Sequence, residues 1–289
     1  ENANYIRRNK MRNKRRINNL IVFVFFAFFS IAVAFPFFWM ISNSIKTKDE
    51  IWSFPPMLLP QDPQWVNYTD AFKGANFGRY MFNSTFTAIC ITLIIIVNSA
   101  MMAYAFSQLN FKSKKILFAL VLGTYMLPAA ATYVPSYIIL AKLKMLNSYQ
   151  GLIISSCVSV LGIFLSRQAF MQISKDFVES AKIDGANHWR ILWQILFPMT
   201  RTTFVTLALL TFIGAYNSYL WPSLIIKSKD LYTVTMGLNS FFMTDGAYGL
   251  KWGAIMAACT IITVPLLILF FICQKGIIEG VAIDSGTKG

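Results

Sequence analysis

The stretch "ESAKIDGANHWRILWQILFP", from Glu179 to Pro198, indicates how this chain folds. It places charged residues, a glycine and an amphipathic run between two long apolar stretches. Ser174 is suited to cap a short helix, and Gly185 permits a sharp reversal that a Cβ would resist. Asn187 is suited to cap a second helix directly after the turn. The pattern predicts a helix–turn–helix segment over residues 171–200, lying along a membrane surface.

The second helix of this segment is amphipathic. Its apolar residues recur at i, i+3, i+4 and i+7, the spacing of one helix face, and they are Trp189, Leu192, Trp193 and Leu196. Pro198 predicts a break before the next apolar stretch begins. An ordinary interfacial helix with a solvated charged face has the same periodicity, so the periodicity alone leaves both interpretations open.

The composition is that of a membrane protein. Hydrophobic residues make up 56% of the 289 residues and charged residues only 13%, whereas soluble domains carry about 25% charged residues. The net charge of +14 is spread over segments that flank the apolar runs, which is a topology signal and not a nucleic-acid patch. We expect a lipid bilayer and no nucleic acid as partner. The four cysteines lie in apolar runs without CxxC spacing, and we interpret them as small core residues.

Six uncharged stretches are each long enough to cross about 30 Å of hydrocarbon. They are Leu20–Ser44, Tyr80–Gln108, Ile116–Ala141, Leu146–Ser166, Thr202–Ile226 and Trp252–Gln274. Prolines within several of them predict kinked or broken helices, and these are Pro36, Pro128, Pro135 and Pro265. The fourth stretch is rich in Gly, Ser and Cys, which favours close helix packing. The predicted fold class is all-α, a polytopic membrane protein with six transmembrane helices.

The first stretch also resembles a secretory signal, because a basic leader precedes it and Ala32-Val33-Ala34 suits a cleavage site. The apolar run continues beyond that point, so we favour a retained transmembrane helix. Seventeen of the 26 Lys and Arg residues fall on the side of the N-terminus, which predicts that both termini are cytoplasmic. The predicted organisation is a basic cytoplasmic segment (1–16), a first transmembrane helix (17–44), an extracytoplasmic segment (45–79), a five-helix core (80–275) and a cytoplasmic tail (276–289).

The chain lacks the residues that would let it power transport or catalyse a reaction by itself. No Asp, Glu, Lys, Arg or His lies within the six stretches, whereas proton-coupled carriers place such groups in the membrane. The sequence contains no GxxxxGK[ST] loop for ATP phosphates. The single histidine, His188, has no catalytic partner nearby, and we interpret it as a surface residue. We therefore predict no catalytic residue and no metal site, and we expect energy to arrive from another polypeptide.

A family resemblance narrows the interpretation of the cytoplasmic segment. The residues Glu179-Ser180-Ala181, Asp184-Gly185-Ala186, Ile195 and Pro198 resemble the EAA loop of ABC importer permeases. Ser180 stands where the family has a second alanine, and Thr200–Thr203 stands where many members have a further proline. The resemblance extends over nearly the whole chain, through "FGRYMFNST", "FIGAYNSYLWPSLII" and the ending "DSGTKG". The chain thus resembles the carbohydrate-uptake (MalG-like) permeases, the inner-membrane components of binding-protein-dependent transport.

The resemblance implies a type I ABC importer permease architecture and a set of partners. These are a second homologous permease subunit, two cytoplasmic ATPase subunits that bind ATP and Mg²⁺, and an extracytoplasmic sugar-binding protein; this chain itself needs no cofactor. It also implies that the EAA segment is a coupling helix, with roles for Glu179, Ala181, Asp184, Gly185 and Ala186. The tail "DSGTKG" would reach toward the ATPase pair, and a frayed end is the competing interpretation. The expected location is the bacterial inner membrane.

Uncharged polar and aromatic residues in the apolar stretches are the chemistry that a sugar pathway needs. We predict Tyr216, Asn217, Tyr219 and Trp221 as pathway residues, although each would serve equally well in helix packing. An importer of a non-sugar solute is the alternative, because its permease would share the coupling loop. A carrier or channel that works without ATP is a third hypothesis, and it predicts transport by this polypeptide alone.

Overall fold

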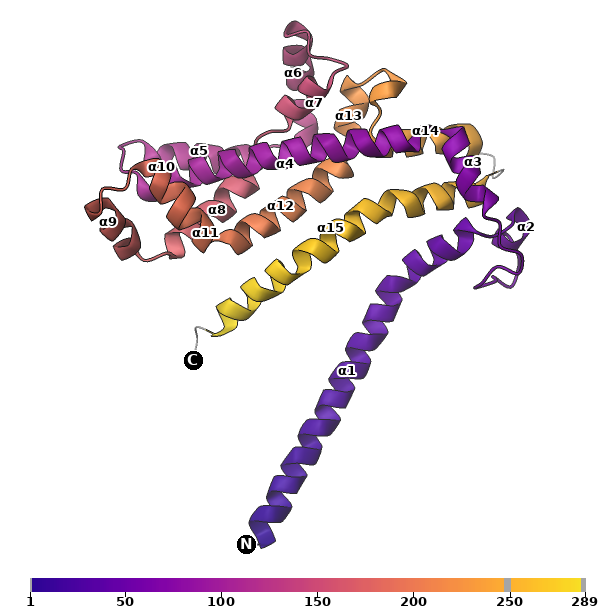
Figure 1. The fold of residues 1–289 in the computed structure, drawn as a ribbon, viewed down its shortest axis with the longest axis horizontal. Helices are drawn as coiled ribbons and strands as arrows, with labels where there is room; N and C mark the ends of the chain where they lie inside the picture. The colour runs from indigo at the N-terminus through magenta and orange to yellow at the C-terminus, as the bar shows by residue number, and fades with distance from the viewer. Residues whose placement is uncertain (1, 247–250, 287–289) are drawn as a thin grey trace. The chain divides into compact units, whose positions relative to one another are not determined.

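The computed structural model describes the backbone of residues 2–246 and 251–286 and the side chains of residues 18–244 and 251–274. Every regular element in this part of the chain is a helix, which confirms the predicted all-α class (Figure 1). The chain forms two compact units, one of residues 1–71 and 245–260 and the other of residues 72–244 and 261–289. The last three residues of the predicted cytoplasmic tail lie outside the described residues.

The first unit contains the long helix α1 (Asn2–Ser44), the short helix α2 (Lys48–Ile51), most of α3 (Val66–Gly74) and the start of α15 (Trp252–Gly286). The apolar part of α1, Asn18–Ser44, is 27 residues long, and none of its most apolar window is buried inside the chain. A helix of this length spans about 40 Å at 1.5 Å per residue, enough to cross a bilayer with some tilt. The helix ends at Ser44, as predicted, and the basic segment before it continues the same helix.

The segment after α1 is fixed by two charged side chains. Thr47 and Glu50 form a capping box at α2, and the second Glu50 carboxylate oxygen accepts a hydrogen bond of 2.6 Å from the Gln61 backbone N–H. Lys46 is almost fully buried; its Nζ donates to Asn43 Oδ1 at 2.8 Å and lies 4.3 Å from the centre of the Trp39 ring. Burial lowers the pKa of Lys46, and hydrogen bonds from the backbone of Thr47 and Gln61 lower the pKa of Glu50.

The second unit is built around α4 (Phe77–Gln108), which packs against α8 and α12 (Figure 1). Its helices before residues 171–200 are α5 (Lys114–Tyr125), α6 (Ala129–Lys142), α7 (Tyr149–Ser155) and α8 (Val160–Gln172). The segment 171–200 holds α9 (Lys175–Ile183), α10 (His188–Arg190), the π-helix η1 (Ile191–Leu196) and α11 (Phe197–Met199). The remaining elements are α12 (Arg201–Tyr216), α13 (Leu220–Ile225), the 3₁₀ turn η2 (Lys229–Leu231), α14 (Val234–Phe241) and the π-helix η3 (Phe242–Gly246). The rest of α15 completes this unit.

Three of the six predicted spans are broken. The described residues contain three helices long and apolar enough to span a membrane, within α1, α4 and α15, and three bent helix pairs that raise the number to six if each pair is one span. The third predicted span is α5 and α6, bent by 101°, and the fourth is α7 and α8, bent by 48°. The fifth prediction needs correction, because its helix stops at Tyr216 and a separate short helix, α13, follows after a break. The third bent pair instead joins residues 188–199 to α12, at 81°.

Local chemistry accounts for two of these breaks. Pro128 stands at the N-cap of α6, and a residue before proline avoids the α conformation, so α5 ends at Tyr125. Ser159 caps α8 by accepting a hydrogen bond of 3.0 Å from the Gly162 N–H. Pro36, Pro135 and Pro265 lie inside continuous helices, so they do not break them.

The predicted close packing of the fourth span is seen at Gly162 of α8. A Cβ at this position would lie 2.6 Å from Ser99 Oγ of α4 and 3.2 Å from both terminal methyls of Leu207 of α12. Glycine therefore lets three helices approach at one point. The close contact at Gly162 holds α4, α8 and α12 together, although these helices are far apart in the sequence.

Candidate coupling loop and substrate cavity

The segment of residues 171–200 folds as the predicted helix–turn–helix. Ser174 Oγ accepts a hydrogen bond of 3.3 Å from the Asp176 N–H and caps α9, and Asn187 Oδ1 accepts one of 2.9 Å from the Arg190 N–H and caps α10. Gly185 stands between the two helices with a φ of +77°, in the left-handed region that favours glycine. A Cβ at Gly185 would meet no heavy atom within 4 Å, so backbone conformation alone demands the glycine. We call residues 171–200 the coupling loop.

The turn itself is closed by two backbone hydrogen bonds. The Ala186 N–H donates to the Ala181 carbonyl at 2.9 Å, and the Gly185 N–H donates to the Lys182 carbonyl at 3.0 Å. This pair of bonds is a Schellman motif, which satisfies carbonyls at the end of α9. The turn is therefore a defined corner between α9 and α10.

The buried face of the second helix differs from the predicted one. Leu192 and Leu196 are buried as predicted, but Trp189 is 59% exposed and Ile191 is fully buried instead. The reason is the π-helix η1, in which the Phe197 N–H donates to the Leu192 carbonyl, five residues back. A π-turn brings residues five apart onto one side, so Ile191 and Leu196 share the inward face.

The loop packs its small and apolar residues inward and leaves its charges outside. Ala181 and Ala186 are half-buried against a cluster that includes Tyr104 of α4, Phe170 of α8 and Phe204 of α12. Three other predicted coupling residues, Glu179, Asp184 and Gly185, are exposed. Two apolar side chains share this outer surface, because Phe177 is 54% exposed and Ile183 is 86% exposed. The loop therefore presents a surface that carries charges of both signs together with apolar groups, and the core packs against its inner side.

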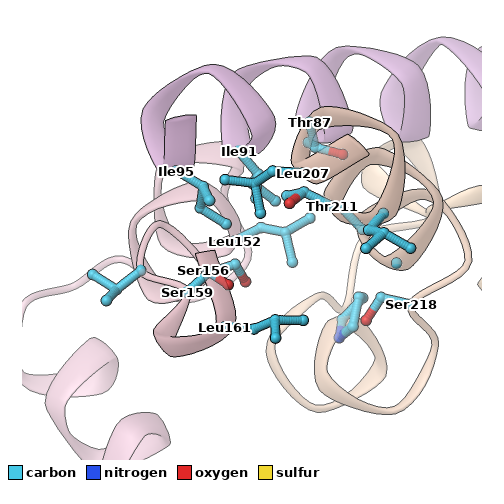
Figure 2. A pocket seen from close by; sticks show the side chains of 15 residues that line it. Thr87, Ile91, Ile95, Leu152, Ser156, Ser159, Leu161, Leu207, Thr211 and Ser218 are labelled. Carbon is cyan, nitrogen blue, oxygen red and sulfur yellow. The ribbon is translucent and has the colours of Figure 1, made fainter. Parts of the chain in front are cut away.

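A cavity of about 330 Å³ lies beside the break between α7 and α8 and the C-terminal end of α12. Its walls are α4, the α7–α8 break, the C-terminal half of α12 and the residues that follow it. Thr87, Ser156, Ser159, Thr211 and Ser218 bring hydroxyls to it from separate elements, and Figure 2 shows them around one space with Ile91, Ile95 and Leu207. None of the described residues that line it is ionisable. The cavity is thus polar through hydroxyls alone.

The four predicted pathway residues lie beside this cavity and do not line it. The Tyr216 hydroxyl is buried and donates to the Ile262 carbonyl at 3.1 Å, which ties α12 to α15. Trp221 Nε1 donates to Ser155 Oγ at 2.8 Å, and the Tyr219 hydroxyl donates to Asn239 Oδ1 at 3.1 Å. Asn217 is exposed at the C-cap of α12, next to Ser218 of the cavity. A substrate role for these four stays a prediction.

Sequence reasoning missed the hydroxyl residues that do line the cavity. Serines and threonines are common in apolar helices, so none of them stands out by type. The available signal was the run "SSCVS" at residues 155–159, whose last serine is a helix cap. Among the described residues no group of three or more His, Cys, Asp or Glu side chains could hold a metal ion, and the four cysteines there form no disulfide and are half-buried.

The described part of the chain is all-helical and has a cavity without ionisable side chains beside its broken helices. A closely packed loop lies against the end of α4. These features are those of the membrane component of a solute transporter. The family model described as "Binding-protein-dependent transport system inner membrane component" matches residues 96–282. The chain belongs to this family. The match includes the coupling loop and most of the cavity.

Relatives and solved structures agree with this assignment. The chain is 33% identical over 260 residues to the sn-glycerol-3-phosphate transport system permease protein UgpE of Escherichia coli O1:K1, a match that covers 88% of this chain and 92% of the relative. It is 28% identical over 270 residues to the arabinooligosaccharides transport system permease protein AraQ of Bacillus subtilis strain 168, covering 92% and 94%. The fold is similar to a chain of a bacterial ABC transporter involved in alginate import, with a TM-score of 0.79, 22% identity and coverage of 90% and 96%.

Proposed function

We propose that this chain is a permease subunit of an ATP-driven ABC importer and forms half of the transmembrane pathway for a sugar. The substrate that we propose is an oligosaccharide. The observation that carries the proposal is the cavity, which offers hydroxyls and apolar walls and no ionisable group among its described lining residues. Such walls suit a neutral carbohydrate, because hydroxyl groups pair with hydroxyls and apolar surfaces cover ring faces. Asn217, exposed next to the cavity, is the next contact that we propose along the pathway.

A phosphorylated polyol is the second candidate, and the relative that transports sn-glycerol-3-phosphate favours it. Phosphate recognition uses cations or backbone N–H groups at helix N-termini. The cavity has no cation on its described lining. The N-terminus of α8, capped by Ser159, does lie at the cavity, so the missing cation alone favours the neutral sugar. Relatives named for arabinooligosaccharides and a neighbour for alginate support the carbohydrate class.

The coupling loop is the proposed contact with the ATPase subunits. Glu179 and Asp184 would pair with basic groups on that subunit, and Gly185 holds the corner that the contact requires. Ala181 and Ala186 would support this contact indirectly, because their small side chains let the loop pack closely on the core. A rigid-body movement of the ATPase pair would then shift the loop and the helices behind it. ATP and Mg²⁺ would be bound by those subunits, and the proposal assigns no cofactor to this chain.

The remaining partners follow from the same proposal. A second, homologous permease would close the pathway, and an extracytoplasmic sugar-binding protein would dock on residues 45–79 and 227–251, of which 247–250 lie outside the described residues. The family places the chain in the inner membrane, and we propose that both termini are cytoplasmic. Support for this orientation comes from the distribution of Lys and Arg, with seventeen of 26 on the N-terminal side.

The test is uptake into liposomes that contain the assembled importer with ATP inside and binding protein outside. We expect uptake of a labelled neutral oligosaccharide that needs both, and a higher half-saturating concentration in Thr211→Val. Thr206→Val is the matched control, because Thr206 bonds the Thr202 carbonyl of its own helix at 3.0 Å and does not line the cavity. Uptake of sn-glycerol-3-phosphate alone would favour the second candidate. Uptake by this chain without ATP would refute the importer.

A further inference from the structure

One polar contact joins the coupling loop to the central helix. The Tyr104 hydroxyl of α4 lies 2.7 Å from His188 Nδ1 at the start of α10, and the two rings meet edge to face with centroids 5.8 Å apart. Tyr104 is only 5% exposed, whereas His188 is exposed on its other side. Which atom donates depends on the tautomer of the imidazole, and the bond exists in either arrangement. His188 lies at the surface, as predicted, and it also has a defined partner in Tyr104.

The surroundings of this bond are apolar. Behind His188, the buried residues of the loop are Ile191, Leu192 and Leu196, and they pack in one cluster with Tyr104. Apolar contacts depend little on direction, so two surfaces of this kind can slide by a fraction of an ångström at small cost. A hydrogen bond of 2.7 Å requires a set distance and angle between its two groups. The Tyr104–His188 bond therefore fixes the register of the loop on α4.

The same helix forms a wall of the substrate cavity. Thr87, Ile91 and Ile95 of α4 line the cavity, and Ile91 lies 13 residues before Tyr104, a separation of about 20 Å along a helix. The helix runs unbroken from Phe77 to Gln108, past both the loop and the cavity. Helix α12 also reaches both, because Phe204 stacks on Phe197 of the loop and Thr211 lines the cavity. Helix α4 is therefore one of the elements that connect the loop to the cavity, and it is the one that carries the Tyr104–His188 bond.

We propose that Tyr104 and His188 are a positioning pair for energy coupling: their hydrogen bond makes α4 move with the coupling loop, so that a push on the loop reshapes the cavity. This inference rests on the proposed function, in which an ATPase subunit moves the loop. It adds a residue pair outside the EAA motif and a route through α4. If the bond had only a structural role, its loss would lower stability and leave the ratio of solute imported to ATP hydrolysed unchanged.

The test uses Tyr104→Phe in the assembled importer, because this change removes one hydroxyl and keeps the ring. We expect the ratio of solute imported to ATP hydrolysed to fall roughly two- to tenfold, the range for losing one net hydrogen bond. Tyr149→Phe is the matched control, since its hydroxyl donates to Asn83 Oδ1 of α4, also at 2.7 Å, far from the loop. His188→Gln, whose side-chain oxygen can accept from Tyr104, should keep more of the ratio than His188→Leu. The double variant Tyr104→Phe/His188→Leu should be no worse than His188→Leu alone.

The possible outcomes distinguish a failure of the Tyr104–His188 pair from a failure of the proposed function. An unchanged ratio in Tyr104→Phe, or an equal fall in Tyr149→Phe, overturns the pair. Glu179→Lys in the same preparation tests the loop itself, because it reverses an exposed charge without touching the Tyr104–His188 contact. If Glu179→Lys uncouples the importer and Tyr104→Phe does not, only the pair is refuted. If Glu179→Lys leaves the ratio unchanged, the coupling role of the loop is refuted, and the pair with it.

Discussion

Gly162→Ala tests the close approach of three helices on which the cavity depends. The added Cβ would lie 2.6 Å from Ser99 Oγ and 3.2 Å from the Leu207 methyls, both tighter than ordinary van der Waals contact. Overpacking of this kind costs roughly 1–3 kcal/mol of unfolding free energy. Replacing a helical glycine by alanine also returns about 0.5–1 kcal/mol of backbone entropy. The net effect of Gly162→Ala is therefore destabilising by as much as about 2 kcal/mol.

The control is Gly123→Ala in α5, where an added Cβ would meet nothing within 4 Å. Gly123→Ala gains the backbone entropy without any clash, so the unfolding free energies of the two variants should differ by the cost of the clash, roughly 1–3 kcal/mol. At roughly 2–4 °C per kcal/mol, that difference separates their unfolding midpoints in detergent by several degrees.

A second substitution shows whether the clash is the cause. Ser99 Oγ is buried without a hydrogen-bond partner in the described structure, so Ser99→Ala removes an obstacle and no bond. The double variant Ser99→Ala/Gly162→Ala should recover most of the fall in unfolding midpoint that Gly162→Ala causes alone. Substitutions at two distant sites would instead have additive effects. Equal midpoints for Gly162→Ala and Gly123→Ala, or strict additivity with Ser99→Ala, would refute the reasoning.

Three further predictions follow from local geometry. Gly185→Ala should lower the unfolding midpoint by the equivalent of about 1 kcal/mol, and Gly185→Asn by less, because asparagine tolerates a positive φ; equal effects would contradict this. The lowered pKa of Glu50 means that its contribution to stability is present above the ordinary glutamate pKa and lost as pH falls through the lower, folded-state value. The protection factor of the Gln61 amide, which is its slowing relative to an unfolded chain at the same pH, should therefore fall on acidification, and Glu50→Gln should weaken this pH dependence. Single cysteines at Lys115 and Lys229 should be labelled by an impermeant reagent from opposite faces of the membrane, whereas labelling from the same face would refute the proposed topology.

Features set by local chemistry could be predicted from the sequence. The caps at Ser174 and Asn187 and the reversal at Gly185 each depend on residues within three positions, and all three occur as predicted. The same holds for Pro128, which breaks the third span. The EAA pattern indicated the family, which the periodicity of the apolar residues alone could not have done.

Features set by packing could not be predicted in this way. The buried position of Ile191 depends on a π-turn that no periodicity of 3.6 describes. Tyr104 and His188 are 84 residues apart, so only the fold brings them together. The cavity hydroxyls come from separate elements for the same reason.

The central claim is that the coupling loop is the contact with the ATPase, and photo-crosslinking from its outer surface tests this most directly. Ile183 is 86% exposed and is the preferred position for a photoreactive side chain in the assembled importer, with Lys229 on the predicted opposite side as control. The account predicts that the probe at Ile183 crosslinks to the ATPase subunit and that the probe at Lys229 does not. An importer that hydrolyses ATP and yields no crosslink from Ile183, or an equal crosslink from both positions, would contradict it.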